Sequence, residues 1–542
     1  MSRQEINPNH AAPAWTPARS AVGLHNPWLV AVVVALPVFL ELLDTTIANV
    51  ALRNIAGSLS SGTEESTWVI TSYLVANAIV LPVSGWLCDV VGRKRFFMAC
   101  VAMFTVASLL CGTATSFPAL IVFRVIQGLG GGGMVPISQL ILAESFPPAK
   151  RGLAFAIWGM AVVVSPILGP PLGGWLTETY SWPWIFFLNV PMGLLALLLC
   201  WLFLEEPPLL VAERRQRWAA GIRLDYVGFL LAAAGLACLE VVLSKGEIKG
   251  WFASGLICAF AGVAGGALLA LVLWEWRRRQ PVVEVTLFRW RTFSMSFVMM
   301  FGAGMVLYSS NTFVPMLMQL CHGYTAFTAG LVVMPGGIGA AIGMLGVGVL
   351  TRYVQLRYLV AAGLVLQIGP YLQMCGFTPD LTFWQVAMVR MVAAVGLGFL
   401  FVPVMALSYE GLPAGAASGA TTLTNIARNI GGSFGISMAN TWLVWRTQYH
   451  HSVLVEHLTP YNPLVTEALA RVQVAAPAAG GGDPLTDPVV LTAVDGLVSQ
   501  QAAVMAFNDI FFLSAILCAG MLLLVPLLAR NQPGHGDLMA GH

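Results

Sequence analysis

The sequence predicts an all-α integral membrane protein with fourteen transmembrane helices, arranged as two six-helix bundles with a two-helix insertion between them. Three observations lead to this fold class. Of 542 residues, 58% are hydrophobic and only 10% are charged, whereas soluble globular proteins carry about 25% charged residues. The apolar residues occur in long runs separated by short polar breaks, and the fourth and twelfth runs share a sequence pattern. This composition excludes a soluble protein of similar length.

A transmembrane helix needs about 20 consecutive, mostly apolar residues. Fourteen segments meet this requirement: 27–51, 66–88, 96–114, 118–142, 152–176, 184–204, 226–244, 252–275, 293–320, 328–350, 358–376, 382–409, 418–445 and 508–529. The polar, Pro-rich start lacks the pattern of a cleaved signal peptide, so the first run is expected to be an uncleaved membrane anchor.

The domain organisation follows from these spans. We expect an N-terminal tail (1–26), a first six-helix bundle (27–204), a linker with an inserted two-helix hairpin (205–291), a second six-helix bundle (292–529) and a C-terminal tail (530–542). The second bundle includes a polar segment at 446–507. This segment is either a solvated loop with a short helix or two, or a docking surface for a partner outside the membrane.

The basic residues predict the orientation. If the N-terminus is cytoplasmic, nineteen of the 27 basic residues fall inside, five fall outside and three lie within spans. Cytoplasmic loops are enriched in Lys and Arg, so a multi-pass protein with both termini in the cytoplasm is expected. A nucleic-acid binder is excluded, because the net charge is only +2 and no basic stripe appears.

The reactive side chains predict neither an enzyme nor a metal site. Nine cysteines lie in or beside apolar runs, without a CxxC motif or a Cys/His ligand spacing. The polar segments contain no nucleophile–base constellation. We therefore expect no catalytic residues, no metal and no cofactor.

An internal repeat connects the fourth and twelfth spans. Arg124 is followed by glycines at positions 130 and 132, and Arg390 is followed by glycines at positions 396 and 398. Two related halves around a central site are typical of secondary transporters.

Three ionisable residues in the first half are candidates for proton coupling. A charged side chain at mid-bilayer costs about 2.5–3.5 kcal/mol on insertion scales. Glu41 and Asp44 are three residues apart and therefore share a helical face. Two carboxylates this close in a low dielectric do not both ionise easily. We interpret them as proton carriers with Arg124 as the counter-ion; a static ion pair that orients the helices is the alternative.

Other polar residues inside spans are weaker candidates. Arg390 and Arg428 are possible polar sites of the second half, and Glu240 lies in the inserted hairpin. Asp509 is expected near the membrane interface.

Two further segments carry unusual residues. The loop after the second span contains Gly85, Asp89, Gly92, Arg93, Lys94 and Arg95, which suggests either a charge latch on the cytoplasmic side or a topology signal. The fifth span contains Pro166, Gly169, Pro170, Gly173 and Gly174. Proline permits bending and glycine permits close helix packing, so this span is either a hinge or a tight static contact.

Together these segments resemble the major facilitator superfamily, in particular its fourteen-helix drug:proton antiporter branch and the EmrB-type multidrug exporters. The loop from Gly85 to Arg95 looks like the signature between helices two and three. Arg124-x-x-Gln127-Gly128 resembles the fourth-helix motif, and the fifth span resembles the antiporter motif. LDTTIANVAL (43–52), TWVITSYLVANAI (67–79), FPPAKRGLAFAIWGM (146–160), WPWIFFLNVP (182–191) and TNIARNIGGSFG (424–435) extend the resemblance over nearly the whole chain.

The resemblance implies a proton-driven exporter of hydrophobic or amphipathic drugs in the inner membrane of a Gram-negative bacterium. It implies a periplasmic membrane-fusion adaptor and a TolC-like outer-membrane channel as partners, besides membrane lipid. It assigns the Gly85–Arg95 loop to a cytoplasmic gate, Arg124 with Gln127 and Gly128 to proton coupling, and the fifth-span motif to export. Glu41 and Arg390 depart from the motifs. Two other functions stay open: export of one native metabolite, such as a siderophore or fatty acid, and a non-transporting membrane sensor or assembly platform.

Overall fold

The computed structural model describes residues 26–206, 208–219, 225–278, 281–351, 353–412, 416–459 and 488–530, together with residues 465, 467 and 469. Within these ranges all regular secondary structure is helical, which confirms the all-α fold class. The N-terminal tail up to residue 25, the C-terminal tail from residue 531 and most of 460–487 lie outside the described residues.

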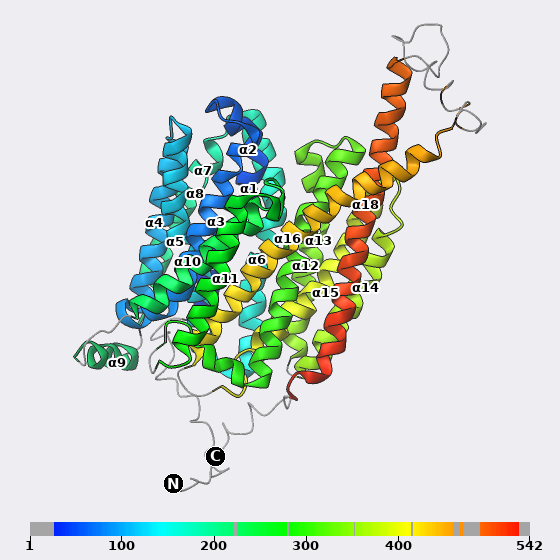
Figure 1. The fold of residues 1–542 in the computed structure, drawn as a ribbon. Helices are drawn as coiled ribbons and strands as arrows, with labels where there is room; N and C mark the ends of the chain where they lie inside the picture. The colour runs from blue at the N-terminus through cyan, green and yellow to red at the C-terminus, as the bar shows by residue number, and fades with distance from the viewer. Residues whose placement is uncertain are drawn as a thin grey trace.

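The helices form two groups that stand side by side (Figure 1). The first half contains α1 (Pro27–Ser58), α2 (Thr63–Ser66), α3 (Trp68–Val91), α4 (Arg93–Gly112), α5 (Phe117–Ser145), α6 (Pro148–Thr179), α7 (Trp184–Phe187) and α8 (Asn189–Phe203). The second half contains α12 (Arg291–His322), α13 (Ala326–Leu350), α14 (Leu356–Met374), α15 (Phe383–Leu407), α16 (Ala417–Glu456), α18 (Pro488–Leu524) and η4 (Val525–Leu527).

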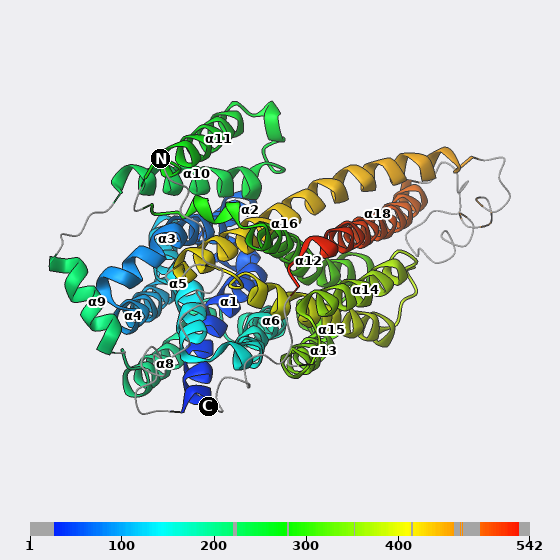
Figure 2. The same ribbon diagram turned by 90° about the horizontal axis from the view of Figure 1, so that it is seen from below.

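The segment between the halves contains α9 (Pro208–Ala219), α10 (Tyr226–Lys245), η2 (Trp251–Ala253), α11 (Gly255–Glu275) and η3 (Val285–Arg289). Figure 2 shows α10 and α11 outside both halves, at the edge where α3 and α16 meet. We call the end of the bundle where α1 begins and η4 ends the terminal side, and the opposite end the distal side (Figure 1).

Twelve helices among the described residues are long and apolar enough to cross a membrane. The helices α14 and α16 are not among these twelve, although they pack within the second half. The fourteen-span count therefore stays a prediction. The polar segment 446–507 is also more helical than expected, because α16 continues to Glu456 and α18 already begins at Pro488. Both helices extend on the distal side (Figure 1).

The seam between the halves is formed mainly by α6 against α13 and by α3 against α16. Small residues explain how α6 also fits against α1 of its own half. A Cβ atom at Gly169 would overlap the side chain of Thr46, and one at Gly173 would lie 3.2 Å from the carbonyl oxygen of Ile47. Glycine therefore lets α1 and α6 cross at backbone contact.

Candidate functional site

The centre of the first half holds a buried network around Asp44. Nη1 of Arg124 lies 2.5 Å from Oδ2 of Asp44, and both side chains are at most 1% exposed. The other carboxylate oxygen, Oδ1, accepts hydrogen bonds from the amides of Gln127 (3.0 Å) and Asn189 (2.7 Å). Three helices supply the four groups: α1 carries Asp44, α5 carries Arg124 and Gln127, and α8 carries Asn189. Charge-assisted bonds of this kind hold the carboxylate in one position.

Arg124 is fixed on its other sides as well. Its Nε donates to the carbonyl oxygen of Val69 (2.9 Å), and its guanidinium lies 4.5 Å from the ring centre of Tyr73 and 5.5 Å from that of Phe186. The following glycines of α5 bring α3 this close, since a Cβ atom at Gly132 would lie 2.6 Å from the carbonyl oxygen of Asn77. Arg124 and the glycines of this span thus both hold α5 against α3.

Glu41 does not share the ion pair. Its Oε1 accepts a hydrogen bond from Asn77 (2.9 Å), and its Oε2 is buried without a hydrogen-bond partner among the described residues. Arg428 of the second half is among the charges that act on Glu41. The two carboxylates, which we expected to act as a pair, therefore have different surroundings. Asp44 forms an ion pair within the first half, and Glu41 faces the seam.

The second half contains a corresponding cluster without a carboxylate. Arg390 is the eighth residue of α15, as Arg124 is the eighth residue of α5. Its Nη2 donates to Oδ1 of Asn311 on α12. Arg390 is 2% exposed. The first helix of each half thus contacts the arginine, but through aspartate in one half and asparagine in the other.

Arg428 lies at the seam on the terminal side. Its guanidinium is 6.0 Å from the ring centre of Trp158, a residue of the first half, and two of its nitrogens have no hydrogen-bond partner in the described part of the chain. Nearby, Asn425 donates to Gln139 of α5 over 2.6 Å, and Trp158 stacks on Phe401 with ring centres 6.3 Å apart. These contacts join the two halves on the terminal side.

The loop between α3 and α4 is held mostly by its own half. Gly92 adopts φ +101°, a conformation that favours glycine, and so turns the chain between the helices. Arg93 forms a salt bridge with Glu144 of α5, and Lys94 donates to the carbonyl oxygen of Trp201 over 2.8 Å. Asp89 precedes the turn at the end of α3. The described partners of Arg93 and Lys94 thus brace the first half and do not cross the seam.

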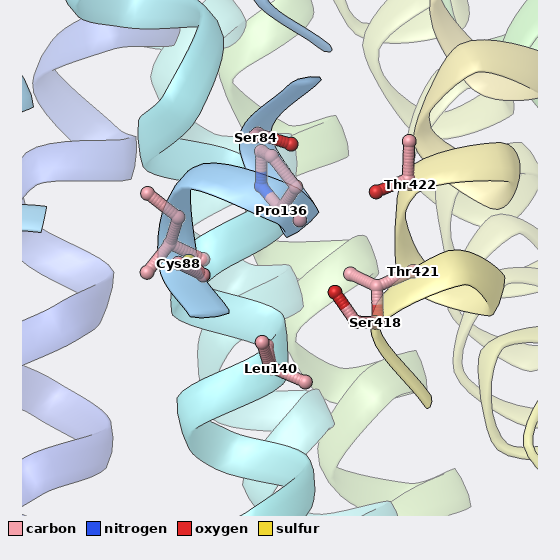
Figure 3. A pocket seen from close by; sticks show the side chains of 9 residues that line it. Ser84, Cys88, Pro136, Leu140, Ser418, Thr421 and Thr422 are labelled. Carbon is pink, nitrogen blue, oxygen red and sulfur yellow. The ribbon is translucent and has the colours of Figure 1, made fainter. Parts of the chain in front are cut away.

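Gly85 is the residue of this motif that meets the second half. A Cβ atom there would lie 2.6 Å from Oγ of Ser418. Figure 3 shows the narrow crevice at this point, between α3 and α5 on one side and α16 on the other. Its volume of about 10 Å³ is near the space of one water molecule. The crevice is lined by Ser84, Gly85, Cys88, Pro136, Ile137, Leu140, Ser418, Thr421 and Thr422.

The proline- and glycine-rich motif lies on the distal half of α6, which runs as one helix through Pro166 and Pro170. Gly169 and Gly173 face α1, while a Cβ atom at Gly174 would lie 3.4 Å from the backbone of Phe327 on α13. The motif therefore touches both halves. Gly128, from the fourth-helix motif, packs against the backbone of Tyr73.

The amides are what sequence reasoning missed. Asn77, Gln139, Asn189 and Asn425 bind the carboxylates or link the halves, and none of them is among the site residues predicted from the sequence. A lone amide side chain inside an apolar span could have indicated these residues, because an amide in lipid needs a hydrogen-bond partner. No group of three or more His, Cys, Asp or Glu side chains that could hold a metal occurs among the described residues.

The geometry of two halves, each with an arginine on its fourth helix, agrees with the comparisons to known proteins. The family model of the Major Facilitator Superfamily matches residues 34–436, well over half of the chain. The chain belongs to the major facilitator superfamily.

Three relatives show which superfamily members this chain resembles. The "Multidrug export protein EmrB" of Haemophilus influenzae is 36% identical over 92% of this chain and 94% of its own. The "Fatty acid resistance protein FarB" of Neisseria gonorrhoeae is 34% identical over 94% and 96%. The EmrB of Escherichia coli K12 is 33% identical over 90% and 92%. The resemblance to EmrB-type members of the superfamily is thereby confirmed.

Solved structures show the same superfamily fold at low identity. The proton:xylose symporter XylE aligns with a TM-score of 0.57 and 13% identity, over 95% of this chain and 98% of that one. The human organic anion transporter MFSD10 aligns with a TM-score of 0.55 and 16% identity, over 91% and 100%.

Proposed function

We propose that the protein is a proton-coupled exporter of hydrophobic or amphipathic drugs that works by alternating access of its two halves. The buried Asp44–Arg124 pair carries this proposal, supported by the EmrB relatives. An ion pair at the centre of an apolar bundle is costly, and it is retained in transporters where a proton or substrate uses it. The two-half architecture suits a transporter, and no enzymatic function is proposed.

The chemistry follows from the contacts of Asp44. A proton that binds the carboxylate removes its charge and weakens the bonds to Arg124, Gln127 and Asn189. The arginine stays charged, because guanidinium does not lose its proton in proteins. Its hydrogen bond to the carbonyl oxygen of Val69 and its contact with the ring of Tyr73 hold it in place. Loss of the bonds to Asp44 frees α1 to shift against α6, and α6 itself packs on α13 across the seam. Glu41, at the seam, is a second candidate carrier.

The distribution of basic residues favours the terminal side as the cytoplasmic side of a bacterial inner membrane. In that orientation Gly85 and its crevice belong to the cytoplasmic gate, and α16 and α18 extend into the periplasm. This extension is a surface on which a membrane-fusion adaptor of a tripartite system would dock, with a TolC-like channel beyond it. Each charge that crosses 100 mV supplies about 2.3 kcal/mol for export.

A growth-inhibition panel on a deletion strain tests the function. We expect the deletion to increase sensitivity to several unrelated hydrophobic compounds, and plasmid-borne wild-type protein to restore resistance. Everted vesicles then report the energy source, because ethidium uptake should collapse when an uncoupler dissipates the proton gradient. Unchanged resistance to the whole panel would contradict multidrug export.

A second candidate is the export of one native compound. The FarB relative, whose name refers to fatty acid resistance, favours a fatty acid. Sensitivity of the deletion strain to long-chain fatty acids alone would select this function.

A further inference from the structure

The inserted hairpin α10–α11 makes side-chain contacts to both halves on the distal side. Within the described part of the chain, three side-chain hydrogen bonds join it to α16 of the second half. Ser433 donates to Oε1 of Glu240 (2.7 Å), Asn440 donates to Oε2 of Glu247 (3.0 Å), and Nε1 of Trp251 donates to Thr441 (3.0 Å). All three partners lie on α16. The two halves are thus connected here through the hairpin.

The contacts with the first half are of a different kind. The helix α10 packs along α3, and this is a much more extensive contact than the one it makes with α16. The ammonium group of Lys245 bonds Thr67 and lies 4.9 Å from the ring centre of Trp68. Lys245 is only 3% exposed. Van der Waals packing over a helix length holds α10 to α3, whereas a side-chain hydrogen bond between helices in lipid contributes only about 0.6 kcal/mol on average.

Glu240 is buried, and it accepts one of the three hydrogen bonds from α16. It lies within the span of α10 and is 5% exposed. Among the described residues it accepts hydrogen bonds from Ser433 and, at 3.5 Å, from Ser244 of its own helix. A small apolar cluster of Leu81, Leu236 and Ile426, one from each of α3, α10 and α16, lies beside this contact. Glu240 therefore marks the point where the hairpin and both halves meet inside the membrane.

We propose that the inserted hairpin moves with the first half and latches the second half on the distal side, with Glu240 as the positioning residue whose bond to Ser433 opens when the halves separate. The inference rests on the alternating-access function proposed above. Alternating access requires α3 and α16 to change their separation on this side. Since α10 contacts both, one of its two interfaces must open, and the hydrogen-bonded one opens at lower cost.

Distances between spin labels test which interface opens. Labels at Thr115 (first half), Ala253 (hairpin) and Thr378 (second half), all exposed, are placed in pairs on a cysteine-free protein that retains transport. Between acidic and alkaline buffer we expect the Thr115–Thr378 and Ala253–Thr378 distances to change and the Thr115–Ala253 distance to stay constant. A constant Ala253–Thr378 distance with a changing Thr115–Ala253 distance would overturn the latch. An unchanged Thr115–Thr378 distance under every condition would instead contradict alternating access itself.

Two serines provide a matched pair of variants for Glu240. Ser433→Ala removes the bond across the interface, and Ser244→Ala removes the bond within α10. We expect Ser433→Ala to shift the population of the separated state roughly two- to tenfold, the effect of one hydrogen bond, and to change kcat of ethidium transport more than KM. Ser244→Ala should behave as wild type. Glu240→Gln, which keeps an acceptor oxygen, should retain the wild-type distribution, and Glu240→Ala should match Ser433→Ala. Equal behaviour of the two serine variants would overturn the role of Glu240.

Discussion

The arginines of the two halves occupy corresponding places but differ in charge balance. Arg124 faces a carboxylate, Asp44, and Arg390 faces an amide, Asn311. Both arginines are buried, so the difference is not one of solvent access. Only the first half can therefore exchange a proton for an ion pair at this position. The two halves therefore share the packing of the fourth helix, and under the proposed function only the first half would carry the proton.

The largest effect is expected from Asp44→Asn, which makes the first half resemble the second. The amide keeps the size of the side chain and an acceptor for Arg124, but it cannot bind and release a proton. We expect loss of gradient-driven ethidium transport in everted vesicles, with normal insertion and folding. Asn311→Ala serves as the control in the second half and should retain transport. Full transport by Asp44→Asn would contradict a proton carrier at Asp44.

The next effect concerns stability. Arg124→Ala leaves the Asp44 carboxylate buried without its counter-ion, and breaking a buried pair costs about 3–5 kcal/mol. Arg390→Ala loses the bond to Asn311 but also removes a charge that no carboxylate balances there, so its cost should be smaller. Thermal unfolding in detergent measures both. Equal losses of stability would show that the two arginines have the same structural role.

Asn311→Asp makes the second half resemble the first. The new carboxylate faces Arg390, and a hydrogen bond to a charged group contributes about 1.5–3 kcal/mol. Part of this gain is lost to desolvation of the carboxylate. We expect a modest rise in the midpoint of thermal unfolding, with Asn311→Ala as the reference. A fall below the Asn311→Ala value would mean that Arg390 has no need of a counter-ion.

The smallest expected effect is a pH dependence of thermal stability, which comes from Glu284 on the terminal side. Glu284 lies between the hairpin and α12, beside Gly419 of α16. Burial raises its pKa from 4.5 to about 7, and the Asp89 charge adds to this rise. The native protein then holds a proton that the unfolded chain has released, so this contribution to stability declines as pH rises from 4.5 to about 7 and levels off above. Glu284→Gln should flatten that part of the thermal stability profile; identical profiles would exclude the effect.

The fold and part of the site were predictable from the sequence. Long apolar runs and the arginine–glycine repeat predict two helical halves, because lipid permits few other arrangements. Asp44, Arg124 and Gln127 were predicted from their cost in the membrane and from the family motif, and the structure brings them together. The separation of Glu41 from Arg124 was not predictable, because three residues of spacing give a shared face but not the neighbours on other helices. Likewise, partners of Arg93 and Lys94 depend on how α5 and α8 pack.

Proton release on substrate binding tests the central claim most directly. Purified protein in weakly buffered detergent solution with a pH indicator is mixed with ethidium, and the released protons are counted per bound dye. If Asp44 is the carrier, the wild-type protein releases protons and Asp44→Asn binds ethidium without releasing them. Equal proton release by both proteins would contradict Asp44 as the carrier. The coupling would then belong to another group, with Glu41 as the first to examine.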